Sequence, residues 1–242
     1  MEIKLGKRKK QIAAIVALCA VAALFLVFRT GCGEALLSTL NRTAAGTKAT
    51  VVLDPGHGGF DPGKVGVAGT KEKDINLAIA IKAKKLLEDS GYTVVMTREK
   101  DEALCSGQER NKKMADLQGR VSIIEETDPA VAISIHQNSY SAGTKGAQVF
   151  YYSADNSGEE TEAKRLAGIL QNTFREVFGD ENKRVEKGNS SYYMLKNVTC
   201  PFAIVECGFL SNPQEEALLC DEKYQQKMAE GICEGIENFL YK

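Results

Sequence analysis

The chain alternates short runs of apolar residues with longer segments whose apolar positions recur every three or four residues. The short runs predict β-strands, and several of them are apolar at consecutive positions, which is typical of strands that are covered on both faces. The predicted strands are Thr50–Asp54, Thr93–Thr97, Val131–Ile135, Ala147–Tyr152 and Phe202–Glu206.

The longer segments predict amphipathic helices. In the first of them Ile75, Ile79 and Ala83 lie on one stripe, and Gly91 marks the end of the segment. The predicted helices are Lys73–Ser90, Asn111–Glu126, Glu159–Phe178 and Glu222–Leu240. This alternation of strands and helices predicts an α/β domain of three layers, with a mostly parallel sheet and helices on both faces.

The N-terminal part departs from this pattern. A basic segment precedes Ile12–Phe28, a run without charged residues, and this order is typical of a secretory signal or a membrane anchor. Because Arg29 follows directly and no small-x-small cleavage site precedes it, we predict an uncleaved anchor within residues 1–30, with a cleaved signal as the alternative. Residues 31–48 are predicted to be a linker and residues 49–242 one domain on the outer side of the membrane.

Composition narrows the classes of function. The chain has 31 Lys and Arg against 32 Asp and Glu, a net charge of −1, so nothing indicates binding to nucleic acid. Its seven cysteines form no CxxC pair, which argues against a zinc ribbon or a thioredoxin-like motif.

The only two histidines of the chain both follow apolar strands. His57 lies in the turn of VVLDPGHGG, after the first predicted strand, and His136 follows the third in AISIHQNS. Glu206 ends the last predicted strand. Since the carboxyl ends of neighbouring parallel strands meet at one edge of the sheet, we expect these three side chains to lie close together.

Such a cluster would suit a metal hydrolase. Two imidazoles and one carboxylate, with one position left open, make a zinc site of the catalytic type, and a further carboxylate must carry the proton from water to the leaving group. The candidates for these two carboxylates are Glu72, at the start of the first predicted helix, and Glu206. Taken alone, each residue also has a purely structural interpretation, for Glu72 as a partner of the helix dipole. No HExxH or P-loop motif is present.

Four segments carry a more specific signal. LDPGHGGFDPGKVG, KEKDINLAIAIKAKKLLEDSGYTVVMTRE, AISIHQNS and PFAIVECGFLSN resemble, in this order, the zinc-dependent N-acetylmuramoyl-L-alanine amidases of the AmiC and CwlD type. The resemblance implies that His57, Glu72 and His136 hold zinc (Zn2+) and that Glu206 is the catalytic acid and base. It also implies a sheet of about six strands and cleavage of the amide bond between N-acetylmuramic acid and L-alanine in peptidoglycan.

Three further residues are candidates for substrate contact. Asn138 belongs to the SIH-x-N motif, and Gln148 stands where many relatives have glutamate. Arg120 precedes the SIH strand, and both a substrate contact and a salt bridge are open for it. Many relatives have alanine where this chain has Gln137.

Within the family, a single catalytic domain behind an apolar segment most resembles the CwlD type, which implies a role in spore cortex and germination. A lipoprotein activates some relatives and would be a partner here. Two alternatives stay open: a peptidase that cuts within the stem peptide, and a partner-activated or regulatory protein with the amidase fold.

Overall fold

A central sheet organises the part of the chain that the structure, a computed structural model, describes: residues 48–154, 160–179 and 182–241. Its strands are β1 (Thr50–Pro55), β2 (Thr93–Met96), β3 (Val131–Asn138), β4 (Gln148–Tyr152), β5 (Lys187–Asn189) and β6 (Phe202–Phe209). They lie in the order β2-β1-β3-β6-β4-β5. The strands β4 and β5 run antiparallel to the other four, so the sheet is mostly parallel, as predicted.

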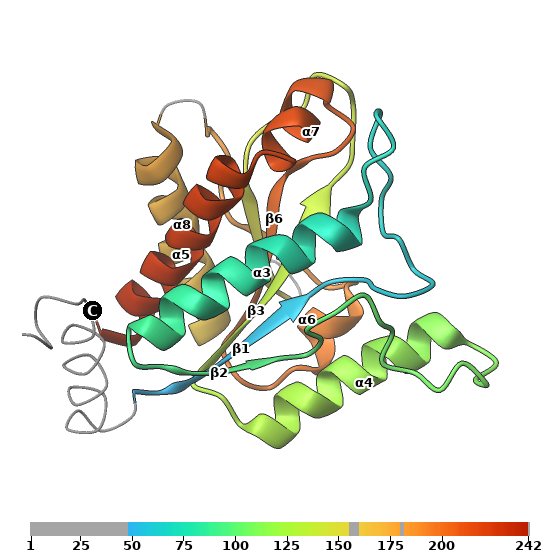
Figure 1. The fold of residues 1–242 in the computed structure, drawn as a ribbon. Helices are drawn as coiled ribbons and strands as arrows, with labels where there is room; N and C mark the ends of the chain where they lie inside the picture. The colour runs from blue at the N-terminus through green and yellow to red at the C-terminus, as the bar shows by residue number, and fades with distance from the viewer. Residues whose placement is uncertain (1–47, 155–159, 180–181, 242) are drawn as a thin grey trace, which may run out of the picture. The chain divides into compact units, whose positions relative to one another are not determined.

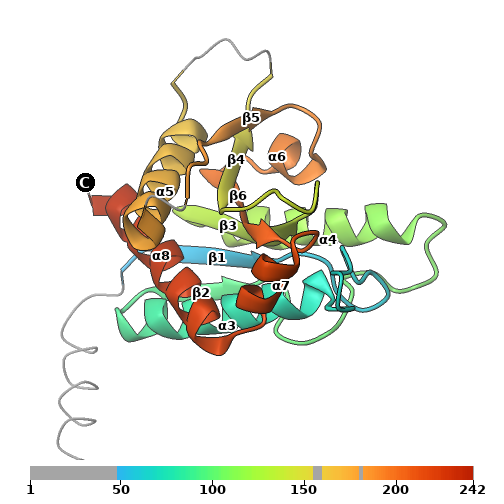
Figure 2. The same ribbon diagram turned by 90° about the horizontal axis from the view of Figure 1, so that it is seen from above.

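Helices cover both faces of this sheet (Figures 1 and 2). They are α3 (Glu72–Asp89), α4 (Lys112–Thr127), α5 (Glu162–Phe178), α6 (Tyr193–Asn197), α7 (Pro213–Leu219) and α8 (Glu222–Tyr241). The helices α3, α5 and α8 pack on one face, and α4 and α6 pack on the other. The prediction of a three-layer α/β domain is confirmed.

Successive strand residues point to opposite faces and so enter two different cores. Ile133 and Val205 pack towards α3, α5 and α8, whereas their neighbours Ala132 and Ile204 pack towards α4 and α6. All four side chains are buried. A strand buried on both sides needs apolar residues at consecutive positions, which explains why the predicted strands lack polar alternation.

All five predicted strands and all four predicted helices are present, with shifted ends. The strands β3 and β6 run on past the predicted Ile135 and Glu206. The helix α5 starts at Glu162, because the side chain of Thr161 caps it by accepting from the backbone N–H of Lys164. Three short elements, β5, α6 and α7, were not predicted.

The predicted anchor Ile12–Phe28 and nearly all of the predicted linker 31–48 lie outside the described residues. Within residues 48–154, 160–179 and 182–241, no helix combines the length and the apolar character needed to cross a membrane. Residues from Lys48 onwards form one compact unit, and the proposed boundaries of anchor, linker and domain stay predictions.

The order of the strands reverses at one place in the sheet. The chain passes from β1 through α3 to β2 on one side and then returns to β3 on the other side of β1, through a helix on the opposite face. Ligands of such sheets bind beyond the carboxyl ends of the strands at the point where the strand order reverses. Here that point lies between β1 and β3.

Candidate active site

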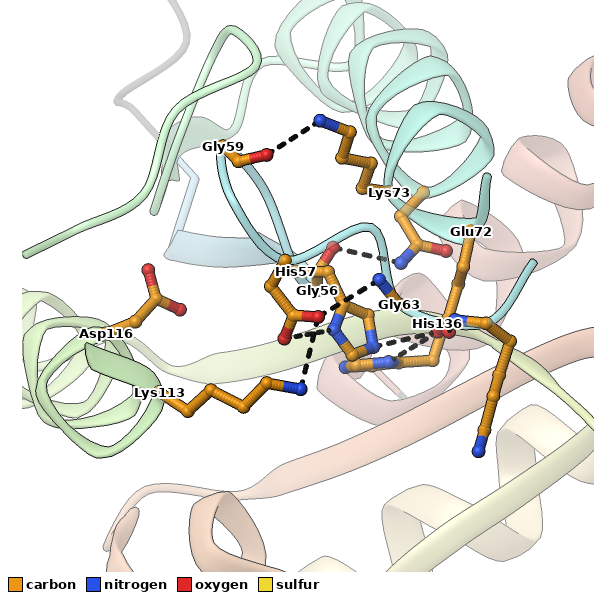
Figure 3. Close-up of polar contacts among 12 residues, drawn as sticks. Gly56, His57, Gly59, Gly63, Glu72, Lys73, Lys113, Asp116 and His136 are labelled. Carbon is orange, nitrogen blue, oxygen red and sulfur yellow. Dashed lines mark hydrogen bonds and ion pairs between the residues drawn. The ribbon is translucent and has the colours of Figure 1, made fainter. Parts of the chain in front are cut away.

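Three side chains that could hold a metal converge at this point. His57 follows β1, His136 lies near the end of β3, and Glu72 is the first residue of α3. The Oε1 atom of Glu72 lies 3.2 Å from Nε2 of His57 and 2.9 Å from Nδ1 of His136. Figure 3 shows both rings directed at this carboxylate. The structure thus brings together the three residues that the sequence analysis named as ligands.

The carboxylate of Glu72 is buried, with 2% of the residue exposed. Its Oε1 accepts the backbone N–H of Gln137 at 3.0 Å, and its Oε2 accepts that of Lys64 at 2.7 Å. Burial alone would raise the pKa of Glu72, but the hydrogen bonds from His136 and His57 outweigh it and hold the pKa well below its usual value. Glu72 therefore stays negatively charged, as a cation site requires.

Each imidazole has a close contact on the side of the ring that faces away from Glu72, and this contact fixes which nitrogen faces the carboxylate. Nδ1 of His57 lies 3.0 Å from Oδ2 of Asp61, so Nε2 is the nitrogen turned towards the carboxylate. The outer edge of the His136 ring packs so closely on Gly56 that a Cβ at this glycine would overlap the imidazole. His57 itself has a φ of 61°, in the left-handed region that non-glycine residues seldom occupy outside special turns.

The donor set fits zinc. The three ligand atoms all lie within 4.8 Å of one another, and two imidazoles with one carboxylate are the protein ligands of catalytic zinc sites. A divalent cation would replace the protons between the rings and Glu72. A carboxylate on the outer nitrogen of a ligating histidine, as Asp61 provides, commonly fixes the orientation of such a ligand.

Glu206 lies beside this cluster on the neighbouring strand. In the register of the sheet it is opposite His136 of β3 on one side and Gln148 of β4 on the other. Only 9% of the residue is exposed, and its Oε2 has no hydrogen-bond partner among the residues that the structure describes. Burial raises the pKa of Glu206 to about 7, although the nearby His136 lowers it in part.

A small cavity of about 220 Å³ opens in front of Glu206. Besides Glu206 and His136, its walls come from α4, β6 and the segment at α6: Leu117, Tyr192, Tyr193, Met194 and Ile204. The cavity therefore brings the carboxyl of Glu206 and the imidazole of His136 together with mainly apolar or aromatic walls.

Arg120 forms two buried ion pairs next to the site. The Nη1 atom of Arg120 lies 2.7 Å from Oδ1 of Asp54 in β1, and Nε lies 2.7 Å from Oδ2 of Asp116. Arg120 also donates to the backbone carbonyl of His57. Because Arg120 is 1% exposed and its donors bind protein groups, we treat it as a positioning residue. Of the two roles open for Arg120, the structure shows the salt bridge, and a substrate contact stays a prediction.

The other two candidates for substrate contact differ in their surroundings. The side-chain oxygen of Asn138 accepts the backbone N–H of Ser139 at 2.8 Å, next to an irregularity in the pairing of β3 with β6. The side chain of Gln148 donates to the carbonyl of Val185 at 2.9 Å and neighbours Glu206 across the sheet. Substrate contact by these two residues stays a prediction.

Two residues that support the ligands were not found from the sequence. Asp61 orients His57, and Gln137 donates its backbone N–H to Glu72 and its side-chain amide to Asn76 at 3.1 Å. His57 and Asp61 are four residues apart in a loop. In a loop, unlike in a helix, this spacing does not predict that two side chains meet. The contacts of Gln137 depend on the packing of α3 against β3.

The sequence of the chain is similar to those of known proteins. Residues 51–238 match the family model for N-acetylmuramoyl-L-alanine amidase. The germination-specific N-acetylmuramoyl-L-alanine amidase of Bacillus subtilis (strain 168) is 39% identical over 195 residues, which cover 78% of this chain and 79% of that protein.

Solved structures agree with the sequence match. The CwlD amidase from Clostridioides difficile, solved in complex with the GerS lipoprotein, has a TM-score of 0.75 and 38% identity over 80% of this chain and 98% of that chain. The amidase AmiC2 of Nostoc punctiforme has a TM-score of 0.69 and 31% identity over 81% of this chain and 100% of its own.

Proposed function

The chain belongs to the N-acetylmuramoyl-L-alanine amidase family, and from this premise we propose that the cluster at β1 and β3 is its zinc-dependent catalytic centre. The reaction is hydrolysis of the amide bond between N-acetylmuramic acid and the L-alanine of the peptidoglycan stem peptide. The observation that carries the proposal is the convergence of His57, Glu72 and His136 beside a second buried carboxyl, that of Glu206.

His57, Glu72 and His136 would hold the ion. When bound, zinc acts as a Lewis acid that polarises the amide carbonyl and makes water nucleophilic near neutral pH. The negative charge of Glu72 and the fixed orientation of His57 on Asp61 favour a cation with few rearrangements of the protein.

Glu206 would transfer the proton. As a carboxylate it accepts a proton from the attacking water, and as a carboxylic acid it returns that proton to the nitrogen of the leaving L-alanine. A pKa near 7 is suited to this exchange, because both protonation states are then accessible near neutral pH. The Oε2 of Glu206, without a hydrogen-bond partner in the described part of the chain, leaves the carboxyl an atom with which to receive the proton.

The biological setting follows from the relatives. The similarity to a germination-specific amidase supports action outside the cytoplasm on the peptidoglycan of spores. The apolar segment Ile12–Phe28 would anchor the chain to the membrane. A lipoprotein would be a partner, as GerS is for the CwlD amidase of Clostridioides difficile.

Product analysis tests this proposal. Purified full-length protein loaded with zinc should release peptides that begin with L-alanine from cortex-type peptidoglycan and leave a free lactyl carboxyl on muramic acid. Addition of a chelator should stop the release, and addition of zinc should restore it. Peptides that begin at a later residue of the stem would indicate a stem-peptide peptidase instead, and release that resists the chelator would contradict the zinc site.

A further inference from the structure

Two consecutive glutamates on α7 are buried without taking part in the proposed chemistry. Glu215 is 7% exposed and Glu216 is 3% exposed. The helix that carries them directly follows β6, the strand of Glu206. Buried carboxylates are costly unless they have partners, so the partners of this pair indicate what the pair does.

Glu216 binds the backbone of a distant loop. The N–H of Ala68 lies 2.9 Å from Oε2 and 3.0 Å from Oε1, and the N–H of Thr70 lies 3.3 Å from Oε1. Gly66 comes so close that a Cβ there would overlap the carboxylate. Burial alone would raise the pKa of Glu216, but these hydrogen bonds outweigh it and hold the pKa below its usual value.

The loop that Glu216 holds joins two of the proposed metal ligands. Residues 58–71, here called the ligand loop, run from His57 to Glu72. The base of the loop is fixed to the metal ligand, since the N–H of Lys64 donates to the carboxylate of Glu72 and the N–H of Glu72 donates to the carbonyl of Lys64. The tip, with Gly66 bonded to Thr70, rests on Glu216.

Glu215 binds elsewhere. Its Oε1 accepts the N–H of Gly146, in the loop between β3 and β4, at 2.8 Å, and its Oε2 accepts the N–H of Phe209, at the end of β6, at 2.7 Å. Glu215 therefore resembles Glu216 in burial, helix and type of partner, but among the described residues its hydrogen bonds go to Gly146 and Phe209, outside the ligand loop.

We propose that Glu216 is a positioning residue of the metal centre, which holds the ligand loop in the conformation that places His57 and Glu72 for zinc. The inference rests on the proposed zinc site and extends it. It connects α7, the helix that follows the strand of Glu206, to the loop between His57 and Glu72, in addition to the pairing of His136 with Glu206 across β3 and β6.

Zinc affinity measured by competition with a chelator tests the proposal on the full-length chain. In Glu216→Gln an NH2 group replaces one carboxylate oxygen, so the side chain loses its negative charge and one of the two oxygens that accept from Ala68. Zinc should bind about tenfold more weakly, at the lower end of the range for residues that orient ligands. Backbone amides of residues 66–70 should exchange hydrogen faster in the zinc-free protein. Glu215→Gln, the matched control, should leave the zinc affinity and these exchange rates as in the wild type.

A second variant approaches the same contact from the loop. Gly66→Ala should displace the carboxylate of Glu216 and weaken zinc binding similarly, and it decides the question if Glu216→Gln does not fold. Unchanged zinc affinity in both variants, or an equal loss in Glu215→Gln, would overturn the inference while leaving the proposed function intact. A wild-type chain that binds no zinc would overturn both, and it would do so before any variant is compared.

Discussion

The proposed metal side and the proposed proton-transfer side of the site each contain a buried glutamate, and the two carboxyls differ in ionisation. Glu72 has donors on both oxygens, from two imidazoles and two backbone N–H groups, and its pKa lies far below the usual value. Glu206 is buried with one oxygen unpartnered among the described residues, and its pKa is raised to about 7.

The number of donors, rather than burial, therefore separates the pKa values of the two carboxyls, and with them the two roles that we propose. Burial disfavours the charged form of both residues, and only hydrogen bonds and nearby positive charge reverse that effect. A carboxylate that never takes a proton suits a metal, whereas one that exchanges its proton near neutral pH suits general acid–base catalysis. Variants on each side test whether the two sides are as distinct as their surroundings indicate.

The largest effect is expected on the metal side. His136→Ala removes one of three proposed protein ligands, and zinc affinity should fall by more than about 100-fold, beyond the range for residues that only orient ligands. Peptide release should fall to the background of the assay. Zinc bound per chain after dialysis is the measurement, and a zinc content equal to that of the wild type would contradict the assignment.

On the proton-transfer side, Glu206→Gln should retain zinc and lose turnover. The amide keeps the shape of the side chain but cannot accept and return a proton, and general acid–base assistance is worth about 10²–10⁴-fold. Turnover and zinc content should be measured on the same preparation. Glu222→Gln, an exposed residue at the start of α8, serves as the control. Loss of zinc from the Glu206 variant would make Glu206 a ligand.

In the zinc-free protein, replacing Glu206 and replacing Glu72 should change the free energy of unfolding in opposite directions. The raised pKa of Glu206 means that its contribution to stability is present below about pH 4.5 and lost as the pH rises through 7. At pH 8, Glu206→Gln should therefore raise the free energy of unfolding by up to about 3 kcal/mol. The lowered pKa of Glu72 has the opposite sign, with stability present above about pH 4.5 and lost as the pH falls.

Glu72→Gln should accordingly lower the free energy of unfolding at pH 8, by about 1–3 kcal/mol for the hydrogen bonds that it weakens. Denaturant unfolding in excess chelator at pH 8 and pH 4 measures both variants. The Glu206 difference from the wild type should shrink at pH 4, where its carboxyl is protonated, whereas most of the Glu72 difference should remain, because Glu72 stays ionised in the folded chain at that pH. A destabilised Glu206→Gln at pH 8 would show that its carboxylate has partners that balance its burial.

The smallest effect is expected from the outer support of the ligands. Asp61→Asn weakens the contact that orients His57, so zinc affinity should fall about tenfold, at the lower end of the range for such partners. Chelator competition measures the change, with Asp74→Asn, at an exposed residue in the first turn of α3, as the control. An affinity equal to that of the wild type would mean that the backbone alone orients His57.

Much of this arrangement could be predicted because it follows from local pattern. Strands buried on both faces leave consecutive apolar residues, and His57, His136 and Glu206 were recognised because each follows or ends such a run. The missed α7 is too short for apolar periodicity, but Asn212 as cap followed by Pro213 is a recognisable helix start. The strand β5 is a three-residue edge strand, Lys187–Asn189, without an apolar run.

The supporting contacts could not be predicted, since they join residues that only the fold brings together. Asp54 and Arg120 meet across the packing of α4 on β1, and Glu216 meets Ala68 across the packing of α7 on the ligand loop. Nothing in the spacing of these residues distinguishes them from surface charges. Their burial at 1%, 1% and 3% exposure for Asp54, Arg120 and Glu216 is a property of the folded chain alone.

A crystal structure of the zinc-loaded protein, with anomalous diffraction recorded at the zinc edge, tests the central claim most directly. The claim is that one buried glutamate binds the metal and the other does not. We expect a single anomalous peak about 2.0–2.2 Å from Nε2 of His57, Nδ1 of His136 and a carboxylate oxygen of Glu72, with the carboxyl of Glu206 outside bonding distance. A peak bonded to Glu206, or one that lacks Glu72, would contradict the account.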